Sequence, residues 1–228
     1  MPRSGRASLA ITRQVLATFG DTCHLCGKPG ATTRDHIIPY SHGGTDDLDN
    51  LRPAHRTCNS RRGNRALNGF GMHIHVVIGP PAAGKTTYVY EHATGIGDIV
   101  IDLDVIARAL MPAMLDERTH VYPKHTRHVA IGARAAAIDR ATRLTTGTHV
   151  WIIHAIPSAD DMDTYRMLRY DIITIDPGRP IVEARVRNDR PTWMHQGVAK
   201  WYATWGKTDP TMNTEPRALV TADAEADW

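Results

Sequence analysis

The sequence predicts two domains of different fold class, a small α+β domain stapled by a metal ion and a larger α/β domain with a parallel sheet. Three observations lead to this prediction. All three cysteines precede residue 59, a glycine-rich break follows at residues 68–71, and beyond the break short runs rich in Ile and Val alternate with longer helical segments. Alternation of this kind is typical of an open sheet with right-handed crossovers.

Composition excludes several classes of protein. Of the 228 residues, 42% are hydrophobic and 22% are charged, which is ordinary for a globular chain and unlike a fibrous or wholly disordered one. No stretch approaches about 18 consecutive apolar residues, so no transmembrane helix and no membrane partner are expected. The N-terminus lacks the apolar segment of a signal peptide. We therefore expect a cytoplasmic protein.

Charge is distributed unevenly along the chain. Residues 1–70 contain 10 Lys and Arg against 5 Asp and Glu, whereas the remainder contains 17 against 19. A basic head on a near-neutral body indicates a polyanion such as nucleic acid as the partner of the head. A solvated basic surface accounts for the same counts, so charge alone leaves the two interpretations open.

The domain boundaries follow from the glycine-rich break and from a change of composition near the C-terminus. The last residues are polar, acidic and poor in large apolar side chains, which is typical of a flexible tail. We predict a first domain over residues 1–67, a linker over 68–72, a second domain over 73–208 and a tail over 209–228.

The elements of the second domain are predicted from its apolar pattern. The strand candidates are mostly apolar without clean alternation, as in strands that are buried on both faces of a parallel sheet. The predicted strands are 73–79, 98–103, 149–154 and 171–176. The predicted helices are 84–94, 104–111, 124–146 and 159–169.

The first domain carries two pairs of metal-ligating residues with the same spacing. Cys23 and Cys26 form the first pair, and His55 and Cys58 form the second, about 30 residues later. Four such ligands can close a tetrahedral structural zinc site, which a domain with so small a core needs. His24 is a competing ligand, but His55 lies at the pairing distance from Cys58. The alternative is reduced cysteines without a metal.

Between and after these pairs lie further ordered elements. They are D-H-I-I-P at residues 35–39, a glycine pair at 43–44, N-L at 50–51 and an asparagine at 59 directly after the last cysteine. In these elements the sequence resembles the HNH (ββα-metal) endonucleases over about residues 20–64. The resemblance implies a β-hairpin and a helix around a nuclease centre.

The chemistry of the central residues agrees with this resemblance. His36 is of a residue type that titrates near neutrality and therefore suits a general base, and the adjacent Asp35 offers an oxygen ligand for a divalent ion. The resemblance implies that Asp35 and Asn59 hold Mg²⁺ or Mn²⁺ on the scissile phosphate and that Asn50 orients His36 by hydrogen bonding. The arginines around Cys58 either hold phosphates or form a solvated helical face; they are Arg56, Arg61, Arg62 and Arg65.

Residues 79–87 read GPPAAGKTT and match the phosphate-binding motif G-x-x-x-x-G-K-[ST], with a predicted strand before it and a predicted helix after it. Backbone N–H groups of such a loop hold the phosphates of ATP or another NTP. Lys85 would reach the β and γ phosphates, and Thr86 would hold Mg²⁺. The predicted nucleotide-binding residues are Gly79, Pro80, Ala82, Ala83, Gly84, Lys85, Thr86 and Thr87.

Two further elements indicate what the nucleotide is used for. The second predicted strand ends in Asp102-Leu103-Asp104, where a carboxylate can accept a proton from an attacking hydroxyl. A cluster of arginines in EARVRNDRP has the composition of a lid that neutralises a transferring phosphoryl group; it comprises Arg185, Arg187 and Arg190.

With these elements the second domain is similar to the polynucleotide 5′-kinase branch of the P-loop phosphotransferases over about residues 73–205. The resemblance implies that Asp104 is the general base, with Asp102 as an alternative or a structural partner, and that Arg187 and Arg190 act from the lid. The family usually has an arginine three residues after the base; this chain has Ala107 there and Arg108 one position later. We expect Arg108 to contact the acceptor.

Together these features predict a bifunctional enzyme that resembles phage-encoded repair or end-healing proteins. It would combine an HNH endonuclease acting on nucleic acid, either DNA, which is favoured, or RNA, with a kinase for 5′-OH ends. An HNH cut leaves a 5′ phosphate, so the kinase would serve ends that another agent makes. Two alternatives stay open: a nuclease whose P-loop domain phosphorylates a small molecule or switches with nucleotide, and a non-catalytic DNA-binding module.

Overall fold

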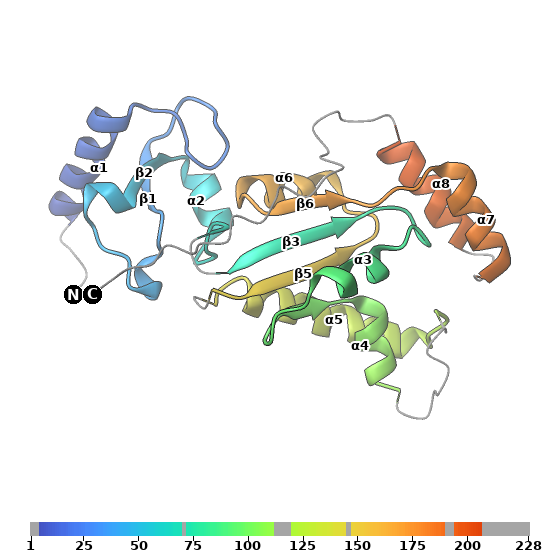
Figure 1. Ribbon diagram of the computed structural model, residues 1–228. Helices are drawn as coiled ribbons and strands as arrows, with labels where there is room; N and C mark the ends of the chain where they lie inside the picture. Colours follow the sequence, from blue (N-terminus) through green and yellow to red (C-terminus); the bar gives the residue numbers. More distant parts are fainter. Residues whose placement is uncertain (1–4, 70–71, 112–119, 145–146, 190–193, 207–228) are drawn as a thin grey trace.

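The structure is a computed structural model that describes residues 5–69, 72–111, 120–144, 147–189 and 194–206 (Figure 1). Residues 70–71 of the predicted linker, the tail predicted over residues 209–228 and the lid residue Arg190 lie outside these described residues. None of the described helices is both long and apolar enough to cross a membrane.

The N-terminal part is an α+β unit, as predicted. A helix, α1 (Gly5–Phe19), precedes an antiparallel hairpin of β1 (Thr33–His36) and β2 (Leu51–Ala54), and α2 (Arg56–Arg62) follows the hairpin directly. Two short 3₁₀ turns, η1 (Tyr40–His42) and η2 (Leu48–Asn50), lie in the loop of the hairpin. This order of two strands and a helix confirms the ββα arrangement.

Helix α1 was not anticipated from the sequence, and long-range contacts hold it in place. Arg34 of β1 donates from Nη1 to the carbonyl oxygen of Ser8 (2.8 Å) and to the hydroxyl of Thr12 (2.7 Å). Val15, within α1, is fully buried. The chain ends α1 with Gly20 in the left-handed region (φ 75°), whose N–H donates to the carbonyl of Leu16.

The C-terminal part is an α/β unit with an all-parallel four-stranded sheet, which confirms the predicted class. The strands are β3 (His73–Ile78), β4 (Ile99–Ile101), β5 (His149–His154) and β6 (Asp171–Thr174), in the order β4-β5-β3-β6. The helices are α3 (Lys85–His92), α4 (Leu103–Ala109), α5 (Lys124–Ala141), α6 (Ala159–Met167), α7 (Arg179–Asp189) and α8 (Met194–Thr204). The predicted strands and helices therefore coincide with observed ones, mostly within two residues at their ends. The helix predicted over 124–146 ends earlier, at Ala141, and residues 145–146 lie outside the described residues.

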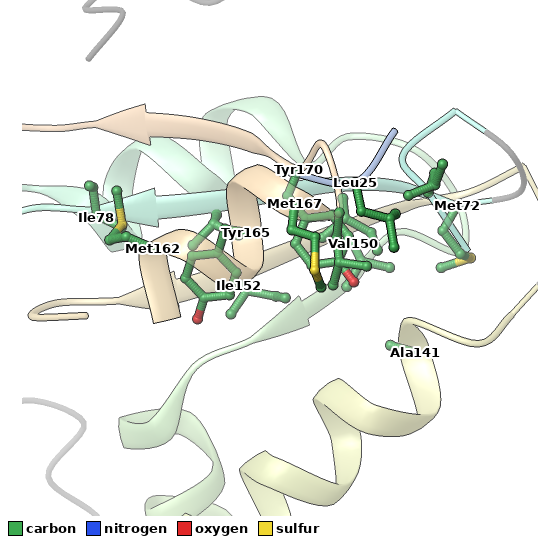
Figure 2. Packing of buried hydrophobic residues seen from close by; sticks show 14 of the residues in the cluster. Leu25, Met72, Ile78, Ala141, Val150, Ile152, Met162, Tyr165, Met167 and Tyr170 are labelled. Carbon is green, nitrogen blue, oxygen red and sulfur yellow. The ribbon is translucent and has the colours of Figure 1, made fainter. Parts of the chain in front are cut away.

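Both faces of this sheet are covered, which explains why its strands lack a clean alternation. On one face Ile74, Val76 and Ile78 of β3 pack with residues of β5, α5 and α6 in the main hydrophobic cluster (Figure 2). On the other face Val77 packs with Val89 of α3 and with Trp151 of β5. Burial on both sides of the central strands leaves room for apolar residues at successive positions.

The two parts share one hydrophobic cluster. Leu25, from the loop after α1, lies beside Met72 and Tyr170 of the C-terminal part in Figure 2, and Cys23 and Ala54 belong to the same buried cluster. Since these side chains exclude water together, the N-terminal part is packed against the sheet domain and not merely tethered to it.

Polar contacts reinforce this packing. Arg61 of α2 donates from Nη2 to the carbonyl of Asp160 (2.7 Å) and to the hydroxyl of Thr164 (2.6 Å), both on α6. The N–H of Ala66, next to the predicted boundary at residue 67, donates to the carbonyl of Thr142 at the end of α5 (3.3 Å). Arg61, which the sequence suggested for phosphate binding or solvent, therefore serves the interface between the two parts.

Candidate functional site

The four predicted metal ligands form one cluster in the structure. The ligand atoms of Cys23, Cys26, His55 and Cys58 all lie within 4.8 Å of one another. Nδ1 of His55 lies 3.4 Å from the sulfur of Cys26 and 3.8 Å from that of Cys58, while its Nε2 lies 3.0 Å from the carbonyl oxygen of Pro29. An Nε2–H donated to this carbonyl leaves Nδ1 as the ligand, a common support for a metal-bound histidine.

The electrostatics of the thiols also suit a cation. Burial, together with the neighbouring thiols of Cys26 and Cys23, raises the pKa of Cys58 to about 11. For Cys23, burial is opposed by backbone N–H groups led by that of His55, and the pKa falls below its usual value. Three crowded thiolates need a positive ion between them, so three sulfurs and one imidazole nitrogen fit Zn²⁺.

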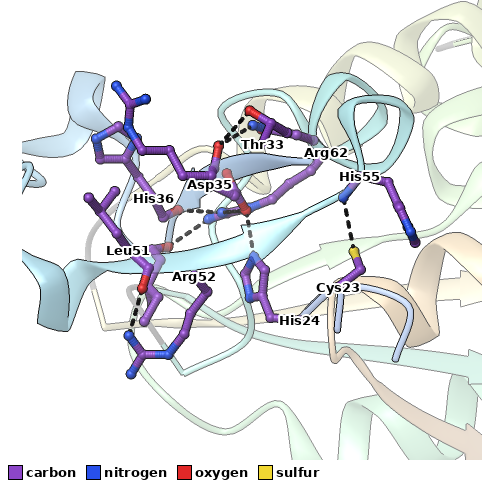
Figure 3. A network of polar contacts seen from close by, with 12 residues as sticks. Cys23, His24, Thr33, Asp35, His36, Leu51, Arg52, His55 and Arg62 are labelled. Carbon is purple, nitrogen blue, oxygen red and sulfur yellow. Dashed lines mark hydrogen bonds and ion pairs between the residues drawn. The ribbon is translucent and has the colours of Figure 1, made fainter. Parts of the chain in front are cut away.

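His24 lies outside this cluster, and its partner is Asp35. Nε2 of His24 is 2.8 Å from Oδ2 of Asp35, so the histidine within the first cysteine pair connects the zinc-type cluster to β1 (Figure 3). Sequence reasoning considered His24 only as a competing zinc ligand and missed this contact. The two residues are 11 positions apart in the sequence, and no motif within one segment predicts their contact.

Asp35 is enclosed by basic side chains. Asp35 is 4% exposed, and its Oδ2 also accepts a hydrogen bond from Nη1 of Arg62 at 2.5 Å (Figure 3). Arg62 is 1% exposed and donates further to the carbonyls of His36 and Ile37. Neither expectation for Arg62, phosphate binding or a solvated face, agrees with this buried ion pair.

The two side chains predicted to hold a divalent ion, Asp35 and Asn59, are of a suitable type but make hydrogen bonds to other groups of the protein. Carboxylate and amide oxygens are ligands that Mg²⁺ and Mn²⁺ accept, but Oδ2 of Asp35 already binds Arg62 and His24. The side-chain amide of Asn59, in α2, donates to the carbonyl of Arg34 (3.0 Å) and ties the helix to β1. A divalent ion at Oδ2 of Asp35 would compete with the guanidinium of Arg62 for this oxygen.

His36 lies on the opposite face of β1 from Asp35 and is accessible. Its side chain is 24% exposed, and its Nε2 lies 3.0 Å from Oδ1 of Asp46. Tyr40 presents its ring edge-on to the imidazole, with 6.5 Å between ring centroids. Asp46 was not predicted; it comes two residues after the glycine pair of the hairpin loop, and only the folded loop brings it to His36.

Asn50 holds the backbone of the same loop. Its Oδ1 accepts from the N–H of Ile38 (2.9 Å), and its Nδ2 donates to the carbonyls of Ile38 (3.1 Å) and Thr45 (2.8 Å). These contacts differ from the hydrogen bond to His36 that the resemblance implied, since they orient the loop and not the ring. Gly44 is required beside them, because a Cβ there would lie 1.8 Å from the carbonyl oxygen of Ile38.

The phosphate-binding motif forms the predicted loop between β3 and α3. Gly79 (φ 150°) and Gly84 (φ 104°) both have positive φ, and a Cβ on Gly79 would lie 2.1 Å from the carbonyl oxygen of Ile175. Lys85 is buried, and its Nζ donates to the carbonyls of Gly79 (2.9 Å) and Pro80 (2.7 Å). The lysine thus lies within the loop that would hold the phosphates of a nucleotide.

A hydroxyl and a carboxylate meet beside this loop. Oγ1 of Thr86 donates to Oδ2 of Asp102 (3.3 Å), and Oδ1 of the same carboxylate caps α4 by accepting from the N–H of Asp104 (2.7 Å). These two oxygen groups fit the Mg²⁺ that accompanies an NTP. These contacts with Thr86 and with the start of α4 agree with the structural role that the sequence left as an alternative for Asp102.

Asp104 lies in a polar cluster on α4. Its Oδ2 is 2.9 Å from Nδ1 of His120, and its carbonyl accepts from the hydroxyl of Tyr122 (3.5 Å). Burial raises the pKa of Asp104, but the hydrogen bond and charge of His120, with help from Arg108, lower it overall, so the carboxylate stays ionised. The side chain of His120 is only 14% exposed.

The position of Arg108 explains why this arginine follows Asp104 by four residues and not by the three that are usual in the polynucleotide kinases. Positions 104 and 108 are one helical turn apart and share a face of α4, where Arg108 influences both Asp104 and Tyr122. Ala107 is fully buried, so an arginine at that position would have to enter the core. The spacing of four therefore keeps an arginine beside the candidate base.

Among the described arginines of the segment predicted as a lid, Arg185 contacts the phosphate loop. Its Nη1 donates to the carbonyls of Ala82 and Ala83, both at 3.2 Å. Arg187, the predicted lid residue two positions later on α7, is exposed, and Arg190 lies outside the described residues. The arginine-rich segment was recognised from the sequence, but only the packing of α7 against the loop shows which member reaches it.

His154 ends β5 in a half-buried polar cluster near the same edge of the sheet. Its Nδ1 lies 2.8 Å from the hydroxyl of Tyr165, and Arg134 of α5 donates to the neighbouring carbonyl of Ile153 (2.9 Å). Burial, and then the charge of Arg134, lower the pKa of His154 to about 4. The imidazole is therefore neutral at physiological pH.

Acidification is expected to destabilise the fold through His154. Its folded-state pKa of about 4 lies below the ordinary value of 6.5, so its contribution is complete above about pH 6.5 and is lost as the pH falls toward 4. The loss should reach about 1–2 kcal/mol at about pH 5. Urea unfolding across this range should show a weaker pH dependence for His154→Gln than for wild type. His128→Gln, an exposed control on α5, should follow wild type. Equal slopes for all three proteins would contradict the prediction.

Comparisons with known proteins agree with the two parts. Residues 23–65 match the HNH endonuclease family, and residues 74–169 match a family described as AAA domain. No curated protein matches the chain.

Solved structures also match at low identity. A sugar kinase from Janibacter sp. is 19% identical with a TM-score of 0.37, over 57% of this chain and 77% of that chain. The Pnkp1/Rnl/Hen1 RNA repair complex matches at 15% identity and a TM-score of 0.43, over 68% of this chain and 53% of that chain. A second structure of that complex matches at 17% identity and a TM-score of 0.41, over 69% of this chain and 50% of that chain. This chain thus spans about half the length of the chains it matches there.

The ββα unit with its cysteine–histidine cluster and the parallel sheet with its phosphate loop coincide with the two matched segments. The chain therefore consists of an HNH endonuclease domain with a zinc-type Cys₃His cluster, followed by a P-loop domain on a parallel four-stranded sheet.

Proposed function

We propose that the protein is a bifunctional nucleic-acid enzyme, a metal-dependent endonuclease joined to a kinase that phosphorylates 5′-OH polynucleotide ends. The observation that carries the proposal is the shared hydrophobic cluster, in which Cys23 and Leu25 of the HNH domain pack with Met72 and Tyr170 of the P-loop domain. A domain that handles nucleic acid is thereby held against the phosphate-transfer domain, which favours a common class of substrate.

In the nuclease, His36 acts as the general base. The imidazole removes a proton from water, and the resulting hydroxide attacks the scissile phosphate and expels the 3′ oxygen, which takes up a proton from solvent water. A divalent ion, with Asp35 and Asn59 as its ligands once Arg62 has released the carboxylate, would supply positive charge for the leaving oxygen. The products carry a 5′ phosphate and a 3′ hydroxyl.

In the kinase, the phosphate loop holds the NTP and Asp104 receives the proton of the attacking 5′ hydroxyl. Lys85 and Arg185 stand at the loop, where they can neutralise the transferring phosphoryl group. Arg108, on the same face of α4 as Asp104, contacts the acceptor. The kinase thus serves 5′-OH ends made by another agent, because the nuclease does not produce them.

Transfer of label from γ-labelled ATP to 5′-OH oligonucleotides tests the kinase proposal. The full chain should label DNA or RNA ends in the presence of Mg²⁺ and should leave 5′-phosphorylated oligonucleotides unlabelled. If ATP binds but neither type of 5′-OH end is labelled, the polynucleotide substrate is wrong, and a small-molecule acceptor or a nucleotide switch takes its place.

His36→Ala tests the nuclease. We expect Mg²⁺- or Mn²⁺-dependent nicking of DNA to fall by at least ~10²-fold, the usual contribution of a general base. The labelling of 5′-OH ends should be retained, since His36 lies in the hairpin of the other domain, and stoichiometric zinc in the purified variant is the control for folding of the hairpin domain. A variant that nicks at the wild-type rate would remove the hairpin from the nuclease centre.

A further inference from the structure

The hairpin loop of the nuclease domain brings a second acidic side chain to His36. We infer that Asp46 is a positioning residue that fixes the tautomer and orientation of His36, so that Nδ1 is the atom that receives the proton from water. This inference rests on the proposed nuclease function and adds a residue to that centre.

The contact itself selects the tautomer. Oδ1 of Asp46 lies 3.0 Å from Nε2 of His36, and the Asp46 side chain is 16% exposed. An ionised carboxylate only accepts hydrogen bonds, so the neutral imidazole carries its proton on Nε2. The lone pair that can take a proton is then on Nδ1, as a general base requires.

The loop holds Asp46 in place through its backbone. Asn50 binds the carbonyl of Thr45, the residue immediately before Asp46, and both backbone groups of Ile38, two residues after His36. Gly44 permits the close approach of these two stretches of chain. The amide of Asn50 thus fixes the segments that carry the acid and the base, and the acid–base pair needs little further ordering when substrate binds.

The charge of Asp46 serves a second purpose. When His36 takes a proton from water it becomes an imidazolium, and a carboxylate at Nε2 stabilises that cation. The same logic operates in the Ser-His-Asp triad, where the aspartate holds the histidine and is not itself protonated. Asp35 is not available for this role, because it faces the other side of β1 and is paired with Arg62 and His24.

Two substitutions in the full-length protein separate the hydrogen bond from the charge. Asp46→Ala removes both, whereas Asp46→Asn keeps an acceptor oxygen and removes the charge. Asp47→Ala is the matched control, since Asp47 is exposed and its side chain does not cap the N-terminus of η2 by a hydrogen bond. Heteronuclear NMR of the ring nitrogens reports the tautomer of His36 directly, without any cleavage assay.

We expect wild type and Asp47→Ala to show one dominant tautomer with the proton on Nε2. Asp46→Ala should show a mixture, and its kcat for nicking should fall about 10- to 10²-fold with KM nearly unchanged. Asp46→Asn should lie between the two. A merely structural role of Asp46 would not alter the tautomer of His36. If Asp46→Ala unfolds, the tautomer and the nicking rate of Asp46→Asn test the inference instead.

The outcomes distinguish this inference from the proposed nuclease. If His36 has the same tautomer and nicking rate in wild type and in both Asp46 variants, Asp46 does not position the base. If wild type nicks no nucleic acid but the tautomer changes in Asp46→Ala, the contact is confirmed and the nuclease assignment is wrong.

Discussion

Removal of zinc is expected to unfold the HNH domain and to weaken the P-loop domain that packs against it. Chelation or the Cys58→Ser substitution removes a metal whose binding contributes on the order of 10 kcal/mol to small zinc-stapled folds. The cluster that loses its metal includes Cys23, which is fully buried in the hydrophobic cluster shared with Met72 and Tyr170. The sheet of the P-loop domain should survive at a lower melting temperature, because most of its core lies between β3, β5 and α6.

Hydrogen exchange can follow this unfolding region by region. After chelation, peptides covering residues 33–54 should lose protection completely, whereas peptides covering residues 149–154 should keep most of it. His55→Cys is the matched control, since a fourth thiolate holds zinc as well as the imidazole does. Metal analysis that finds no stoichiometric zinc in folded, active protein would refute the assignment of this cluster.

Lys85→Ala and Asp104→Ala are each expected to eliminate phosphate transfer to a 5′-OH end, for different reasons. Lys85 lies within the phosphate loop, so its loss should remove charge stabilisation and weaken every kind of nucleotide turnover. Asp104 lies on α4, where its carboxylate meets His120 and not the loop. Its loss should reduce transfer by at least ~10²-fold and leave nucleotide binding nearly intact.

Asp102→Ala provides the contrast. Because Asp102 binds the hydroxyl of Thr86, its loss should weaken binding of the Mg²⁺–nucleotide complex, which isothermal titration measures. Asp163→Ala, an exposed carboxylate on α6, is the control that should change neither quantity. If Asp102→Ala abolishes transfer with binding intact while Asp104→Ala weakens binding, the two carboxylates have been assigned in the wrong order.

The interface between the two domains makes a truncated fragment unsuitable for testing either activity. Leu25, Arg61 and Ala66 all contact the P-loop domain, so a fragment cut at the predicted boundary of residue 67 would expose apolar surface on both sides.

The sequence by itself determined the features whose chemistry is local. Cys23 with Cys26 and His55 with Cys58 lie three residues apart within each pair, so each pair can reach one ion wherever the chain between them runs. The phosphate loop likewise depends on Gly79 and on the residues that follow it directly. The strands of the P-loop domain were recognisable because burial on both faces leaves a continuous apolar run.

Only the tertiary structure decided which polar side chains meet. Asp35 meets Arg62 across 27 residues of chain, and Arg185 reaches the carbonyls of the phosphate loop across 103 and 102 residues. His36 finds Asp46 because the hairpin loop folds back between them. Such pairs depend on the direction of each side chain and on the packing of separate elements, and neither is encoded in the spacing of residues along one segment.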